Sequence, residues 1–66
     1  MPPFYIEYYC YREQPVMWRR FGRGLFSPLG RSYRDFGAAT AAADALIWRY
    51  HSARVVDVLG NPLYQV

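Results

Sequence analysis

Cys10 and His51 are the only residues in the sequence that could pair as a thiol nucleophile and its general base. The apolar pattern around Cys10 places it on a strand face that we expect to be buried, where a free cysteine behaves as a small inert side chain. The acidic side chains show no close pairing of the kind that acid–base catalysis needs; they are Glu7, Glu13, Asp35, Asp44 and Asp57. The sequence therefore predicts a protein that is not an enzyme.

One cysteine and one histidine also limit what else the chain can hold. A single chain with these residues cannot supply four Cys/His ligands to zinc, and it cannot close an internal disulfide. The segment "GRGLFSPLG" lacks the spacing of a glycine-rich phosphate loop, so we interpret it as a bend followed by a loop. We expect no metal and no cofactor.

A stretch rich in arginine and aromatic residues, "MWRRFGRGLFSPLGRSYR", covers residues 17–34. It carries five of the chain's eight basic residues, all of them arginine: Arg19, Arg20, Arg23, Arg31 and Arg34. Arginine presents a planar fork that fits carboxylate or phosphate and also stacks on rings. The net charge of +3 is modest, so it permits binding to nucleic acid without requiring it.

Tryptophan, tyrosine and arginine are the residues most enriched where protein interfaces are strongest. The leading hypothesis is therefore a surface that binds a protein, with charge-assisted arginine contacts and apolar tryptophan contacts. The residues expected to make this contact are Trp18, Arg19, Arg20, Arg23, Arg31, Arg34 and Trp48.

The alternative hypothesis is a small nucleic-acid-binding domain. Tyr5, Tyr9 and Tyr11 fall on the expected open face of the sheet, beside the arginines, which is the arrangement that single-stranded nucleic acid uses. The same tyrosines and arginines could instead pair across strands and simply keep the open side of a thin sheet soluble.

Two strands are expected before residue 27. The first runs over residues 4–12, with Phe4, Ile6, Tyr8 and Cys10 on the core face and Tyr5, Glu7, Tyr9 and Tyr11 on the face toward water. The second runs from Val16 to about Phe26, with a bend at Gly22 and Gly24. Arg19 and Arg20 are adjacent and must point to opposite faces, so one of them has to extend past the rim of the core. The sequence does not say which.

A helix is expected over residues 35–51, with Asp35 as its N-cap. Helical spacing puts one stripe against the sheet: Ala39, Ala42, Ala43, Leu46, Ile47 and Tyr50. Trp48 falls almost opposite this stripe, beside Ala41 and Ala45. It is either buried by the loop over residues 27–34 or exposed as an interface anchor, for example in a homodimer. A hairpin is expected to close the chain, with strands over residues 54–58 and 63–66.

The expected architecture is therefore α+β, in the order β-β-α-β-β, with one helix packed on one face of an antiparallel sheet in a single domain over residues 1–66. No run approaches the ~18 apolar residues of a membrane span. The first residues do not resemble a signal peptide, and the unpaired cysteine suits a reducing compartment, so we expect a cytoplasmic location. The core of so short a chain is thin, which leaves a subunit stable only as an oligomer as a third possibility.

In its size, its richness in arginine and tyrosine, and the segment "ARVVDVLGNPLYQV" after one alanine-rich helix, the chain resembles the small accessory proteins of bacteriophages and mobile elements of GC-rich bacteria. This resemblance implies a stoichiometric inhibitor, such as an anti-CRISPR or other anti-defence protein, that occupies a surface of a larger host complex. Many proteins of that group are acidic and imitate DNA. This chain is basic, so the resemblance implies direct blocking of an acidic or mixed protein surface.

Overall fold

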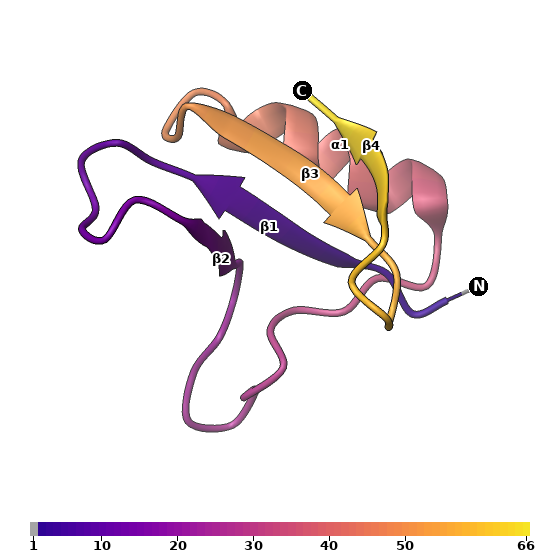
Figure 1. Cartoon of the computed structure of the whole chain (residues 1–66). Helices are drawn as coiled ribbons and strands as arrows, with labels where there is room; N and C mark the ends of the chain where they lie inside the picture. Colours follow the sequence, from indigo (N-terminus) through magenta and orange to yellow (C-terminus); the bar gives the residue numbers. More distant parts are fainter. Residues whose placement is uncertain (1) are drawn as a thin grey trace.

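The computed structural model describes residues 2–66 and has the element order β-β-α-β-β (Figure 1). The elements are β1 (Tyr5–Tyr9), β2 (Trp18–Arg20), α1 (Phe36–Leu46), β3 (Ser52–Val56) and β4 (Pro62–Gln65). The four strands form one antiparallel sheet in the order β2-β1-β3-β4, and α1 lies across one face of it. The α+β architecture expected from the sequence is confirmed.

The core lies between α1 and the inner strands β1 and β3. Ile6 and Val55 are completely buried in this core, and Ala39 and Ala43 belong to the same cluster from the helix. The small alanine side chains let the helix approach the sheet closely. Because α1 packs on β3 and β1, the edge strand β2 extends beyond the part of the sheet that the helix covers. No helix within residues 2–66 has the length and apolar character needed to cross a bilayer.

The N-cap of α1 is confirmed, because Asp35 Oδ2 accepts a hydrogen bond of 2.9 Å from the Ala38 N–H. The helix ends at Leu46, however, and not at His51 as expected. The His51 N–H donates to the Tyr9 carbonyl (2.9 Å), which draws the chain toward β1 and starts β3. The early end leaves Ile47 outside the packed stripe, with 45% of its surface exposed.

The second strand is also shorter than expected, with three residues in place of the run from Val16 to Phe26. Gly22 has a φ of +79°, which turns the chain away from the sheet directly after Phe21. The expected bend at this glycine is confirmed. The strand ends here because a positive φ is incompatible with continued pairing to β1.

The chain leaves the edge of β1 at Phe21 and returns to it at Tyr33. The Phe21 N–H donates to Ile6 (2.8 Å), while Tyr33 and Phe4 exchange two backbone hydrogen bonds of 2.8 and 2.7 Å. Phe21 and Tyr33 therefore pair along the same edge of the sheet, and residues 22–32 form a loop between them, which we call the finger. In Figure 1 the finger projects well away from the sheet.

Candidate binding surface

The finger is held in place by hydrogen bonds at its base and near its tip. At the base, the Arg31 N–H donates to the Phe21 carbonyl (3.0 Å). Near the tip, Gly24 and Ser27 exchange two backbone hydrogen bonds of 3.1 and 3.2 Å. A side-chain contact joins the finger to the sheet, because Arg20 Nη1 donates to the Leu29 carbonyl (2.8 Å). The finger is therefore a loop that is held by hydrogen bonds at its base and near its tip.

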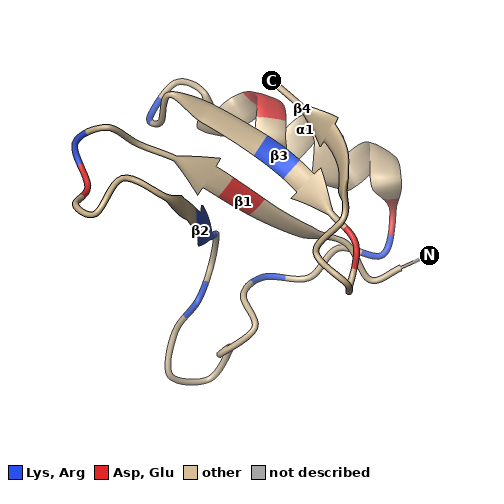
Figure 2. Cartoon of the chain, viewed as in Figure 1, with Lys and Arg blue, Asp and Glu red and all other residues tan. Residues whose placement is uncertain are grey.

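The tip of the finger is apolar and almost fully exposed. Leu25 and Phe26 expose 90% and 95% of their surfaces, and Leu29 is also exposed. Arg23 and Arg31 stand on the two limbs, and neither forms an ion pair with an acid of residues 2–66. Figure 2 shows blue segments on both limbs and no charge at the tip. An apolar tip between two uncompensated positive charges is a surface that suits a partner with apolar and acidic groups.

The open face of the sheet carries a second cluster, which is centred on Glu7. Glu7 lies opposite both Arg20 and Arg54 in the strand register, and its carboxylate is 3.8 and 2.7 Å from their guanidinium nitrogens. Glu7 is on the open face, as expected, but its side chain is only 17% exposed. The flanking arginines cover it, which the sequence pattern of one strand cannot show.

The arginines of this face also cover its rings. The Arg20 guanidinium lies 4.4 Å from the centre of the Tyr5 ring, and that of Arg54 lies 4.1 Å from the Trp18 ring. Tyr9 contacts Trp18 at a ring separation of 5.2 Å. In each of these two stacks, the guanidinium covers one face of the ring, so that face cannot stack on a ligand.

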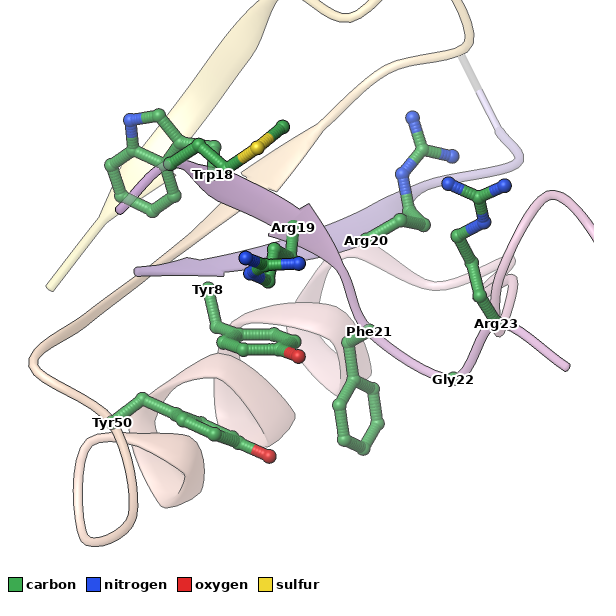
Figure 3. A pocket seen from close by; sticks show the side chains of 9 residues that line it. Tyr8, Trp18, Arg19, Arg20, Phe21, Gly22, Arg23 and Tyr50 are labelled. Carbon is green, nitrogen blue, oxygen red and sulfur yellow. The ribbon is translucent and has the colours of Figure 1, made fainter. Parts of the chain in front are cut away.

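Strand β2 runs between two hollows, one on each side of the sheet edge. The hollow on the helix side has a volume of about 410 Å³, and four rings line it, those of Tyr8, Trp18, Phe21 and Tyr50 (Figure 3). The hollow on the open side has a volume of about 340 Å³ and lies between Glu7 and the finger residues Pro28 and Leu29. Three side chains line both hollows: Trp18, Arg20 and Arg23.

Arg19 is the arginine that points toward the helix side, and Arg20 points to the open side. Arg19 lies opposite Tyr8, whose ring stacks on Tyr50 at 4.0 Å, and its Nη2 donates to the Pro15 carbonyl. Its Nε is 3.3 Å from Glu13 Oε1, within ion-pair range but not aligned for a hydrogen bond. The expectation that one arginine extends past the core rim is confirmed. Burial, with the nearby Glu13 carboxylate, raises the pKa of the Tyr8 hydroxyl above its ordinary value.

Only part of the expected contact set lies together. Trp18, Arg19, Arg20 and Arg23 line the hollows beside β2, and Arg31 stands at the base of the finger. Arg34 lines a separate hollow with Pro2, Pro3 and Ser32. Of the tyrosines, Tyr5 and Tyr9 are on the open face, whereas Tyr11 lies beyond β1, exposed and beside His51.

Trp48 lies beyond the C-terminal end of α1 and exposes 88% of its surface. Of the two alternatives, burial under residues 27–34 is wrong, because that segment is hydrogen-bonded near the other end of β1 through Tyr33 and Phe4. The exposure is compatible with the interface alternative, which stays a prediction. Ala41 and Ala45, beside it in the helical pattern, are exposed as well.

Sequence reasoning missed the exposed apolar residues of the finger and two charges of the open face: Leu25, Phe26, Leu29, Glu7 and Arg54. One signal for the finger was available, since "LF" stands between Gly24 and Ser27-Pro28, where loops usually carry polar residues. The role of Glu7 and Arg54 depends on strand register, which joins residues 47 positions apart.

The residues considered for nucleophilic chemistry are both engaged in the fold. Cys10 is buried, with 2% of its surface exposed. His51 Nδ1 accepts a hydrogen bond of 3.1 Å from the Tyr11 N–H. A buried thiol is poorly placed to attack a substrate in solution.

Comparisons with protein-family models, with curated proteins and with solved structures find no match to this chain. The argument about function therefore rests on the surface formed by β2 and the finger.

Proposed function

We propose that this chain is a non-catalytic interaction protein that binds and blocks a protein partner through β2 and the finger. The observation that carries the proposal is the tip of the finger, where Leu25 and Phe26 are over nine-tenths exposed on a hydrogen-bonded loop. Exposing two large apolar side chains costs solubility, and it is explained if they fill an apolar site on a partner.

Charge supports the same proposal. Arg23 and Arg31 flank the tip without an acid of residues 2–66, so acidic groups of a partner would gain charge-assisted contacts there. A blocking protein needs no chemistry of its own, and the burial of Cys10 agrees with such a role. The resemblance to phage accessory proteins makes a bacterial host complex the partner to test first, with occupation of its working surface as the mode of inhibition.

The test is capture from a bacterial lysate with immobilised wild-type chain and two variants. Leu25→Ser/Phe26→Ser removes the apolar tip, while Leu59→Ser removes a single apolar side chain that is 83% exposed, from the turn between β3 and β4. We expect the wild type and Leu59→Ser to retain the same protein and the finger variant to lose it. The activity of the captured complex should fall as wild-type chain is added in stoichiometric amounts. Equal capture by all three chains contradicts the proposal.

The second candidate is single-stranded nucleic-acid binding, favoured by the gathering of Tyr5, Tyr9, Trp18, Arg20 and Arg54 on the open face. The guanidinium groups already stacked on Tyr5 and Trp18 weigh against it. Binding of fluorescent oligonucleotides at about 50 and about 200 mM salt tests it, because phosphate contacts weaken steeply with salt. Salt-sensitive binding that is lost when Arg20 and Arg23 become Glu supports this candidate; no binding at the lower salt removes it.

A further inference from the structure

We propose that the outer edge of β2 accepts an extended peptide segment of the partner as a fifth strand, and that acidic and apolar residues alternate in this segment. The inference rests on the proposed protein-binding function and specifies the form of what is bound. It follows from three features of β2: its unpaired backbone edge, the two hollows beside it and its charge.

The backbone groups of Trp18 and Arg20 point away from the sheet. Antiparallel pairing alternates between residues that bond across the ladder and residues that do not. Phe21 bonds to Ile6, so Arg19 bonds to its opposite residue Tyr8, and the residues between face outward. Neither Trp18 nor Arg20 has a backbone hydrogen-bond partner outside the ladder among residues 2–66. An added strand would satisfy these groups, which is the basis of strand-addition recognition.

The finger leaves this edge accessible. It departs at Gly22, and its contact with Arg20 is made through the side chain, from Nη1 to the Leu29 carbonyl. The opposite edge of the sheet is less suited to pairing, because β4 begins with Pro62, which has no N–H. The β2 edge is thus the better place for a partner strand.

The hollows determine which side chains the added strand should carry. Alternate residues of a strand point to opposite faces, so a strand along β2 would direct them alternately into the two hollows. The helix-side hollow is lined by the rings of Tyr8, Phe21 and Tyr50 together with Met17 and arginine side chains, and its rings suit an apolar side chain. On the open side, Arg23 lies beside Arg20 (Figure 3) and forms no ion pair with an acid of residues 2–66, so its guanidinium suits a carboxylate.

The positive charge of β2 also disfavours a second copy of this chain as the added strand and favours an acidic partner. Pairing of two β2 edges would bring Arg19, Arg20 and Arg23 of one copy close to the same arginines of the other. Glu7 is already shared between Arg20 and Arg54, and Glu13 is paired with Arg19, so little negative charge is left to offset the repulsion. An acidic segment has no such conflict.

The experiment is amide hydrogen exchange by NMR, with a ten-residue peptide of alternating glutamate and valine as the probe. In the free chain the Trp18 and Arg20 amides should exchange rapidly and the Arg19 amide slowly, because only the last is bonded to β1. With the peptide in excess, we expect Trp18 and Arg20 to become protected by about tenfold or more, with Arg19 unchanged. A peptide of the same composition with its glutamates and valines in two blocks, and one alternating lysine and valine, should give no protection.

A pair of variants tests the backbone contact separately from the charge. Arg20→Ala and Arg20→Pro both remove the guanidinium, but only Arg20→Pro also removes the outward N–H, at an edge position where proline is tolerated. We expect the proline variant to bind the alternating peptide about tenfold or more weakly than the alanine variant. The exchange measurement on the wild type decides the question if the proline variant does not fold.

Three results would overturn the inference: no binding of the alternating peptide at ~1 mM, binding that leaves Trp18 and Arg20 unprotected, or self-association of the chain through β2. These results are separable from failure of the proposed function. If the peptide does not add to β2 but capture of the partner still depends on Leu25 and Phe26, only this inference fails. If capture does not depend on Leu25 and Phe26, the proposed role of the finger fails.

Discussion

The two loops that project from the sheet, the finger and the turn between β3 and β4, both expose apolar side chains but differ in how they are built. Both loops are closed by backbone hydrogen bonds, but in the turn the Asp57 carboxylate also accepts hydrogen bonds from the N–H groups of Leu59 and Asn61, both at 2.9 Å. The finger is closed by backbone bonds and carries arginines on both limbs.

The comparison shows that exposed apolar surface alone does not mark a binding site. Leu59 is 83% exposed, nearly as much as Leu25, but it stands on a short turn without arginines. The finger combines its apolar tip with positive charge, and it stands beside the two hollows and the unpaired edge of β2. This combination is what the account predicts a partner recognises.

The largest expected effect is on the scaffold that both loops share. Ile6→Ala should remove about 2–5 kcal/mol of stability, because the Ile6 side chain of β1 is fully buried in the core under α1. A loss of this size is comparable with the whole stability of about 3–5 kcal/mol that a core of this size supplies. Chemical denaturation followed by circular dichroism measures it. A variant as stable as the wild type would mean that the packed core is wrongly assigned.

A smaller effect is expected at the base of the finger. Gly30 has a φ of +94°, and a Cβ there would stand 2.4 Å from Arg20 Cγ, so Gly30→Ala should cost about 1–3 kcal/mol. Gly24→Ala is the matched control, because nothing lies within 4 Å of its would-be Cβ and its φ is not positive. Thermal melting compares the two. Equal melting temperatures would argue against the close contact between Arg20 and the returning limb of the finger.

The turn between β3 and β4 should respond to acid, and the finger should not. Backbone and side-chain hydrogen bonds from Asn61 hold the pKa of Asp57 below its ordinary value of 3.8. A lowered folded-state pKa contributes stability that is present above pH ~4 and is lost as the pH falls through the folded-state value. We therefore expect the melting temperature of Asp57→Asn to fall less than that of the wild type as the pH is lowered below about 4. Thermal melting over a series of acidic pH values measures this difference. An unchanged acid limb would mean that the Asp57 hydrogen bonds do not survive in solution.

The smallest effect on stability is expected at the tips of the two loops. Substitutions at these tips should differ in their effect on partner binding. Phe26→Ser and Leu59→Ser should each change stability by less than about 0.5 kcal/mol, because both side chains are almost fully exposed. Only Phe26→Ser should weaken retention of the partner. Isothermal denaturation and quantitative capture with the same two variants separate the effects. A large loss of stability in Phe26→Ser would show that the tip packs against the chain and is not free to bind.

Much of the scaffold could be predicted from the sequence, because alternation and helical spacing are local properties. Phe4, Ile6 and Cys10 are buried as the pattern of the first strand predicted, and Asp35 caps the helix. The helix end was wrong because it depends on the hydrogen bond from His51 to Tyr9, a tertiary contact that propensity does not contain.

The candidate site was less predictable for the same reason. The sequence indicated a basic-aromatic stretch, but the division of Arg19 and Arg20 between the two faces and the clamping of Glu7 depend on the register of β1 with its neighbours. The finger exists because Phe21 bonds to Ile6 of β1 and Tyr33 bonds to Phe4, directly before β1. No local pattern in residues 22–32 encodes that pairing.

Site-specific photo-crosslinking tests the central claim most directly. Benzoylphenylalanine is introduced in two separate chains, as Phe26→benzoylphenylalanine and Leu59→benzoylphenylalanine, and each is irradiated in the same bacterial lysate. Both positions are more than four-fifths exposed, so accessibility to the probe is matched. The account predicts one discrete cross-linked partner from position 26 and none from position 59. A discrete product from position 59, with none from position 26, would contradict it.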